Sequence, residues 1–155
     1  MSLQEEVELL RKVPLFAKIE LSKLKLLAFT SDRMVFVPGE VLFKQGEAGD
    51  FAYLIMSGTA DVSVKMPTGQ LSVATLGEHE IVGEIAMLCD VPRTATVTVI
   101  TELVTLRISK DLFMQLIEEF PQMAVEIMRE LARRLEVTTV RLREAVATGQ
   151  ADSDG

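Results

Sequence analysis

The sequence predicts one mainly β domain with helices at both ends, and three observations support this prediction. The chain has 155 residues, which is about the length of a single domain. Between residues 34 and 108 the apolar residues occur in short runs rich in Val, Ile, Phe and Thr, which is the pattern of β-strands. Before and after this segment they recur at helical spacing. The strand-rich part is therefore expected to be a sandwich, a jelly roll or a barrel.

Residues 1–32 are expected to form a helical lead-in. Apolar residues recur at helical spacing over 3–12 and again over 21–30. Pro14 lies between these two stretches and interrupts the pattern, because proline lacks the backbone N–H that a helix interior requires. The lead-in is therefore expected to contain two short helices.

Residues 33–108 are expected to contain strands joined by short turns. The apolar runs that predict strands are 34–37, 41–43, 51–56, 61–64, 71–76, 94–100 and 103–108. Glycine and proline separate these runs at close intervals, as in Pro38-Gly39 and Pro67-Thr68-Gly69. Connections this short favour antiparallel pairing of neighbouring strands.

Residues 109–148 are expected to form two helices. Ser109 is placed to cap the first helix, which ends before Pro121. Pro121 then begins a second helix, because proline is favoured in the first turn, and no glycine or proline interrupts it before Thr148. The polar and acidic residues 149–155 are expected to be a disordered tail.

The second of these helices carries an apolar seam with nearly heptad spacing. Its members are Ala124, Ile127 or Met128, Leu131, Leu135, Thr138, Leu142 and Val146. Such a seam predicts a homodimer formed through residues 121–147. The alternative is that the seam packs against the sheet of its own chain.

The composition disfavours several classes of function. The chain has 16 basic and 23 acidic residues, and this net charge of −7 argues against binding to nucleic acid or to an anionic membrane. No apolar run approaches the length of about 18 residues that spans a bilayer, and the first residues are acidic, so a cytoplasmic protein is expected. With a single histidine, His79, and a single cysteine, Cys89, neither a multi-histidine metal enzyme nor an internal disulfide is expected.

Residues 82–97 interrupt the strand pattern with a segment suited to hold a nucleotide. Gly83 precedes good helix formers, so one or two helical turns are expected there, with backbone N–H groups free to bind an anion. The guanidinium of Arg93, at the head of the next strand, can close over the same anion. An ionised Glu84 accepts hydrogen bonds, as from the hydroxyls of a sugar. Phosphate and ribose side by side indicate a nucleotide.

Each of these features alone also has an ordinary structural explanation. Arg93 can be a surface charge paired with Asp90, and Glu84 can simply cap the short helix. The conjunction is what favours a binding site, because a helix inside a β domain is opened by Gly83-Glu84 and closed by Pro92-Arg93-Thr94-Ala95.

This segment resembles the phosphate-binding cassette of the cyclic nucleotide-binding domains found in protein kinase A regulatory subunits, cyclic nucleotide-gated channels and the bacterial catabolite activator protein. The matching residues are 83–88 and 93–97, at the spacing of that family, and residues 37–62 resemble its first β-hairpins. The resemblance covers nearly the whole chain. It implies an eight-stranded antiparallel jelly-roll β-barrel with an internal phosphate-binding helix, N-terminal helices and two C-terminal helices.

The resemblance also implies how the ligand is held. Arg93 would hold the exocyclic oxygens of the cyclic phosphate, Glu84 the ribose 2′-hydroxyl, and the N–H groups of Ile85 and Ala86 the phosphate from its other side. The ligand-binding residues expected on this basis are Gly83, Glu84, Ile85, Ala86, Arg93, Thr94, Ala95, Thr138 and Thr139. No metal or cofactor is expected.

The identity of the base depends on three threonines, one in the cassette and two on the last helix. Thr94 follows the arginine of the cassette, and in the family a hydroxyl here can bond guanine, which leaves cyclic GMP (cGMP) open. Residues 132–139 resemble the stretch of the catabolite activator whose Thr-Ser pair meets adenine, and this favours cyclic AMP (cAMP). The corresponding residues of this chain are Thr138 and Thr139.

The expected function is a sensor of cAMP whose binding is coupled to movement of the C-terminal helices. No acid–base pair or nucleophile set accompanies Arg93, so an enzyme is not expected. The alternatives are a cGMP-selective sensor and a dimerisation domain of the same fold that has lost its ligand. Unlike the catabolite activator, the chain is expected to lack a DNA-binding domain.

Overall fold

The computed structural model describes residues 2–13, 16–17 and 19–154. Helices α1 (Leu3–Arg11) and α2 (Leu21–Thr30) precede the first strand, in agreement with the helical spacing of the sequence. Ser2 caps α1, because its hydroxyl accepts a hydrogen bond from the N–H of Glu5 at 3.2 Å. Pro14, expected to separate the two helices, lies outside the described residues.

The middle of the chain forms β-strands that are joined by short turns. They are β1 (Asp32–Phe36), β2 (Val41–Phe43), β3 (Phe51–Ser57), β4 (Ala60–Met66), β5 (Gly69–Leu76), β6 (Ile81–Val82), β7 (Thr96–Val99) and β8 (Leu103–Ser109). Over the described residues they form two four-stranded antiparallel sheets, with the orders β1-β8-β3-β6 and β2-β7-β4-β5.

Two sheets replace the closed barrel that the sequence predicts, so that part of the prediction is wrong. Each sheet keeps its own edge strands, and the described strands show no hydrogen-bonded ladder that joins one sheet to the other. The apolar pattern does not separate the two cases, because a sandwich and a barrel both bury one face of every strand. The jelly-roll connectivity stays a prediction.

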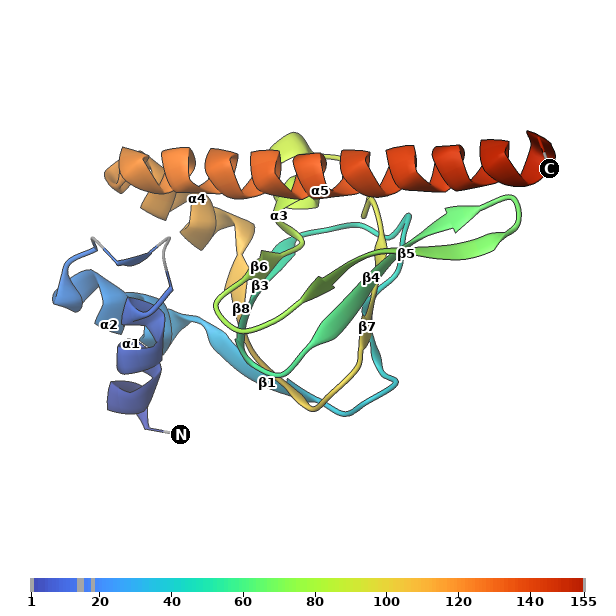
Figure 1. Cartoon of the computed structure of the whole chain (residues 1–155). Helices are drawn as coiled ribbons and strands as arrows, with labels where there is room; N and C mark the ends of the chain where they lie inside the picture. The colour runs from blue at the N-terminus through green and yellow to red at the C-terminus, as the bar shows by residue number, and fades with distance from the viewer. Residues whose placement is uncertain (1, 14–15, 18, 155) are drawn as a thin grey trace.

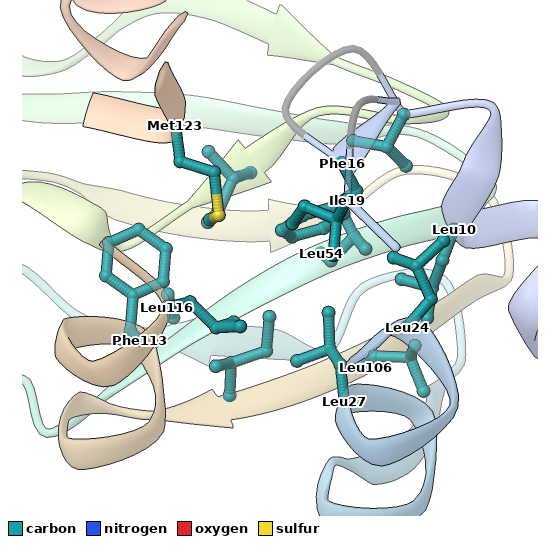
Figure 2. Packing of buried hydrophobic residues seen from close by; sticks show 14 of the residues in the cluster. Leu10, Phe16, Ile19, Leu24, Leu27, Leu54, Leu106, Phe113, Leu116 and Met123 are labelled. Carbon is teal, nitrogen blue, oxygen red and sulfur yellow. The ribbon is translucent and has the colours of Figure 1, made fainter. Parts of the chain in front are cut away.

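Two hydrophobic clusters hold the sheets and helices together. The larger one lies where α1, α2 and the C-terminal helices pack on the sheet that contains β8 and β3, and its residues include Leu10, Leu54 and Leu106. Figure 2 shows Leu24 and Leu27 of α2 beside Leu106 of β8. The smaller cluster joins residues of both sheets and includes Phe43, Tyr53 and Val97.

Two helices follow β8, as the sequence predicts. Helix α4 (Lys110–Glu119) is capped by Ser109, whose hydroxyl accepts from the N–H of Leu112 at 3.3 Å. Helix α5 (Pro121–Asp154) is much longer; in Figure 1 it crosses the top of the molecule in front of α3 and above the β4–β5 hairpin. It passes the predicted end near Thr148, and because the side chains of 148–155 lie outside the described ones, the disordered tail stays a prediction.

Helix α5 is buried only near its beginning. Met123 and Ile127 are buried in the larger cluster. Leu131 is partly buried against the same cluster. Beyond it the described members of the apolar seam are exposed, and Leu135 has 68% of its surface accessible. None of the helices in the described part of the chain is long and apolar enough to cross a membrane.

Candidate functional site

The short helix α3 (Glu84–Cys89) lies between β6 and β7, where the sequence predicts one or two helical turns. Gly83 precedes it with φ of 89° and ψ of 5°, a left-handed conformation that glycine adopts without strain. A Cβ atom at this position would also collide with the guanidinium of Arg93. Gly83 is therefore required both by the turn and by the close approach of Arg93.

Arg93 is the most deeply buried cation of this site, with 5% of its surface exposed. Its Nη1 donates to the carbonyl of Gly83 at 2.9 Å, and its Nη2 donates to the carbonyl of Phe51 at 2.7 Å. The guanidinium carbon lies 4.0 Å from the centre of the Phe43 ring, a cation–π contact. Burial lowers the pKa of Arg93 from its ordinary value, because the charged form loses water.

One nitrogen of Arg93 stands out. Its Nε is buried and has no hydrogen-bond partner among the described residues. An arginine carries five N–H donors, and the two bonds to the carbonyls of Gly83 and Phe51 use two of them. A buried donor without a partner costs about 1–3 kcal/mol, so an anion that accepts from Nε would remove the cost.

The backbone of Arg93 is fixed by the loop between β2 and β3. Its N–H donates to the carbonyl of Glu47 at 2.7 Å, and its carbonyl accepts from the N–H of Gly46 at 2.8 Å. A Cβ atom on Gly49 would come within 3.0 Å of the guanidinium carbon, so only glycine fits there without displacing Arg93. This loop therefore holds Arg93 at both its backbone and its side chain.

Glu84 is the second charged group of the site. Only 1% of its surface is exposed, and it occupies the first turn of α3. Its negative charge is among those that favour the charged form of Arg93 and so oppose the effect of burial on the arginine's pKa. Two buried opposite charges in one small site are suited to a ligand that carries both an anion and hydrogen-bond donors.

These residues surround a cavity of about 310 Å³. Its polar end is formed by cassette residues, which are Gly83, Glu84, Ala86, Arg93, Thr94 and Ala95. The rest of its lining is mainly apolar and comes from strands, with Phe43, Val62, Val64, Val73, Ala74 and Leu76. A cavity of this size with one polar and one apolar end suits a small amphipathic ligand.

The structure brings most of the predicted binding residues to this cavity, but not all. Ile85 lies in α3 between two lining residues, and its side chain is outside the described ones. Thr139 is not among the described residues that line the cavity, and its hydroxyl donates to the carbonyl of Leu135 at 2.8 Å within α5. The side chain of Thr138 lies outside the described ones.

Sequence reasoning did not find the residues that support Arg93 from other strands. Phe43, Gly49 and Phe51 all contact its guanidinium. In the sequence, Gly49 lies in the short segment between two predicted strands and indicates no more than a turn, and the pattern of the sequence carries no signal for the two phenylalanines. Over the described residues, no group of three His, Cys, Asp or Glu side chains could hold a metal ion.

The model of the cyclic nucleotide-binding domain matches residues 33–120. A CRP-like cAMP-activated global transcriptional regulator of Mycobacterium tuberculosis is 30% identical over 142 residues, which cover 91% of this chain and 63% of that protein. A cAMP-dependent protein kinase regulatory subunit of Yarrowia lipolytica is 39% identical over 108 residues, covering 70% and 28%. The chain thus spans less than two thirds of these relatives.

Solved structures show the same fold. The catabolite activator protein of Thermus thermophilus is 26% identical with a TM-score of 0.73, and the match covers 86% of this chain and 63% of that one. The N-terminal domain of a transcriptional regulator from Streptomyces coelicolor is 31% identical with a TM-score of 0.64, covering 84% and 94%.

Proposed function

Because the chain belongs to the cyclic nucleotide-binding domain family, we propose that it senses cAMP in the cavity beside Arg93 and passes the signal to its C-terminal helices. The single observation that carries this proposal concerns Arg93, a buried residue that lines the cavity and whose Nε has no hydrogen-bond partner among the described residues. A cyclic phosphate supplies the oxygens that such a guanidinium needs.

The two ends of the cavity suggest how the ligand lies in it. The phosphate would accept hydrogen bonds from Arg93 and from the N–H groups of Ile85 and Ala86, at the polar end. The ribose 2′-hydroxyl would donate to the carboxylate of Glu84, a buried residue that lines the same cavity. The base would then lie on the apolar strands, where its flat faces lose little by leaving water. Gly83, Thr94 and Ala95 complete the polar end.

Two considerations support cAMP over cGMP. The bacterial and fungal relatives described above are named for cAMP, although they are longer proteins than this chain. In addition, the Thr139 hydroxyl donates its proton to Leu135, so only its lone pairs remain, and these can accept from the amino group of adenine. Guanine presents a carbonyl at that position and needs a donor instead. Thr94 could supply one, so a cGMP-selective sensor is the second candidate.

A short path connects Arg93 to helix α4. Arg93 donates to the carbonyl of Phe51, and the preceding carbonyl, of Asp50, accepts from the N–H of Lys110 at 3.1 Å. The ammonium of Lys110 also forms an ion pair with Asp90, which ends α3. A phosphate that reorients Arg93 would therefore act on the first residue of α4, and through it on α5.

The exposed seam of α5 supports a homodimer through residues 121–147, with the seams of two copies packed together. Successive helical residues point about 100° apart, so Thr138 and Thr139 cannot both face one cavity. One threonine would contact the base in its own chain and the other the base in the second copy. In this proposal the protein is a cytoplasmic regulatory module without catalytic activity, and its β-strands follow a jelly-roll path.

Calorimetric titration of the purified chain with cAMP and with cGMP tests the proposal. Binding of cAMP with the higher affinity supports it, and higher affinity for cGMP favours the second candidate. Ligand at about 100 times its Kd should also raise the free energy of unfolding by about 2.7 kcal/mol. If neither nucleotide binds while the chain is folded, the proposal is wrong, and the alternative of a ligand-independent dimerisation domain is favoured.

A further inference from the structure

On the apolar side of the cavity, two adjacent residues of one strand both line the cavity, which a regular strand does not allow. This side includes Val62 and Val64 of β4, which are two residues apart and therefore lie on the same face. It also includes Val73 and Ala74 of β5, which are adjacent. Adjacent residues of a regular strand point to opposite faces, so one of these two needs a separate explanation.

A β-bulge provides that explanation. Val62 pairs with Ala74, but the next residue, Ser63, pairs with Ser72, and the register shifts between the two pairs. Val73 is thus the extra residue that no residue of β4 opposes. Bulges re-aim side chains near functional sites. On the other face of the hairpin, the hydroxyl of Ser72 donates to the carboxylate of Asp61.

The bulge adds one branched apolar side chain to this part of the cavity. The hairpin side chains that line it are then Val62, Val64, Val73, Ala74 and Leu76, and none of them carries a hydrogen-bonding group. Such a wall stabilises a ligand in proportion to the apolar area that it covers. It gives no advantage to one pattern of donors and acceptors over another.

We propose that Val73, turned into the cavity by the bulge, is a specificity-determining residue that selects the base by its flat apolar area. This inference rests on the proposed function, because it assumes that a cyclic nucleotide occupies the cavity. A purine covers more of the wall than a pyrimidine does, so the wall favours purines. It does not separate adenine from guanine, and that discrimination falls to polar groups elsewhere, such as Thr94.

The test measures the affinities of cAMP, cGMP and cyclic CMP (cCMP) for the parent chain and for Val73→Ala. Removal of the two methyl groups should weaken both purine nucleotides roughly tenfold and cCMP less, and should leave the ratio of cAMP to cGMP unchanged. Thr75→Ala is the matched control. Thr75 lies on the same strand, pairs with Asp61 and is exposed, so its loss should change none of the three affinities.

A second variant distinguishes a change in the cavity from a general disturbance of the β4–β5 hairpin. Val73→Ile keeps the branched side chain and adds one methylene, so the narrowed cavity should weaken purines more than cCMP. The proposal is overturned if Val73→Ala weakens all three nucleotides by one factor, if it changes the ratio of cAMP to cGMP, or if Thr75→Ala has the same effect. A folded parent that binds none of the three contradicts the proposed function itself.

Discussion

The cassette and the second half of α5 differ in where their partners come from. In the cassette, Glu84 and Arg93 are almost completely buried, and carbonyls of the same chain accept from the arginine. On α5, the apolar side chains of Met128, Leu135 and Val146 are each at least 59% exposed. One region is enclosed by its own chain, whereas the other displays apolar surface without cover from it.

This difference indicates which kind of change each region tolerates. A substitution in the cassette removes a group from a site that one chain supplies, and its full effect falls on ligand affinity. A substitution on the seam of α5 acts first on association between chains, and only through it on the ligand. The loss of affinity for cAMP, measured at a protein concentration that favours the proposed dimer, allows substitutions in the cassette and on the seam to be compared directly.

The largest effect is expected for Arg93→Leu. This change leaves the anionic phosphate in a buried site without its cationic partner, which costs on the order of 2–5 kcal/mol of binding free energy. Calorimetry should therefore show at least a tenfold loss of affinity for cAMP. Arg129→Leu is the control, because Arg129, whose side chain is 71% exposed, pairs with Glu126 of α5 at 3.1 Å and is not among the described residues that line the cavity. Unchanged affinity in a folded Arg93→Leu variant would disprove the cassette assignment.

A smaller loss is expected at Glu84, and two substitutions there separate charge from hydrogen bonding. Glu84→Ala removes the acceptor for the ribose hydroxyl and should cost about 1.5–3 kcal/mol, as for hydrogen bonds to charged groups. Glu84→Gln keeps an acceptor and should cost less. The comparison is made by titration with cAMP and with 2′-deoxy cAMP. If 2′-deoxy cAMP loses as much affinity as cAMP does on Glu84→Ala, Glu84 does not bind the 2′-hydroxyl.

The fold was predictable where its signals are local. The periodicity over 3–12 and 21–30 and the cap at Ser109 require only a few neighbouring residues, and the structure has helices at each place. Strand β6 was missed because two residues, Ile81 and Val82, are too short for a periodic pattern. The separation into two sheets depends on pairing between strands far apart in sequence, which the alternation of apolar residues does not encode.

The candidate site divides in the same way. Gly83, Glu84 and Arg93 fall within eleven residues, so their spacing could be recognised. The contact of Arg93 with the carbonyl of Phe51 spans 42 positions and involves a backbone group, which every residue has. The bulge at Val73 has no sequence signal either, because valine and alanine side by side are ordinary in a strand.

The seam of α5 is expected to affect ligand binding more weakly than the cassette. Leu135→Glu places a charge in the centre of the proposed interface and should convert a dimer to a monomer in analytical ultracentrifugation. The affinity for cAMP should then fall by the worth of one hydrogen bond from the second copy, about 0.5–1.5 kcal/mol.

Val137→Glu is the matched control for this change. Val137 is 45% exposed and, at about 100° per residue, lies on the opposite face of α5, so a dimer formed through the seam should survive there. A parent chain that is monomeric at all concentrations, or a dimer that persists in Leu135→Glu, contradicts the seam.

The smallest effect is expected for the ion pair between Lys110 and Asp90, which joins the start of α4 to the end of α3. The side chain of Asp90 is 78% exposed and that of Lys110 is 37% exposed, and ion pairs this accessible to water contribute little to stability. Its proposed role is to connect the cassette to α4, so Lys110→Met should leave cAMP affinity nearly unchanged. What should shrink is the change in hydrogen exchange of α4 on addition of cAMP.

A second ion pair provides the control for this connection. Lys23 pairs with Glu119 at 2.7 Å and joins α2 to the other end of α4, away from the cassette, so Lys23→Met should alter the hydrogen exchange of α4 equally with and without ligand.

The ion pair between Lys110 and Asp90 should also depend on pH. The hydrogen bond from Lys110 to Asp90 raises the lysine's pKa above its ordinary 10.5. Because the folded-state pKa is the higher one, the contribution of the pair is complete from neutral pH up to about pH 10.5 and is lost as the pH rises through the raised value. Salt should weaken the pair at neutral pH. If Lys110→Met and Lys23→Met change the exchange of α4 in the same way, the signal does not pass through the ion pair of Lys110 with Asp90, and the hydrogen bond from the backbone N–H of Lys110 to the carbonyl of Asp50 is the remaining connection to test.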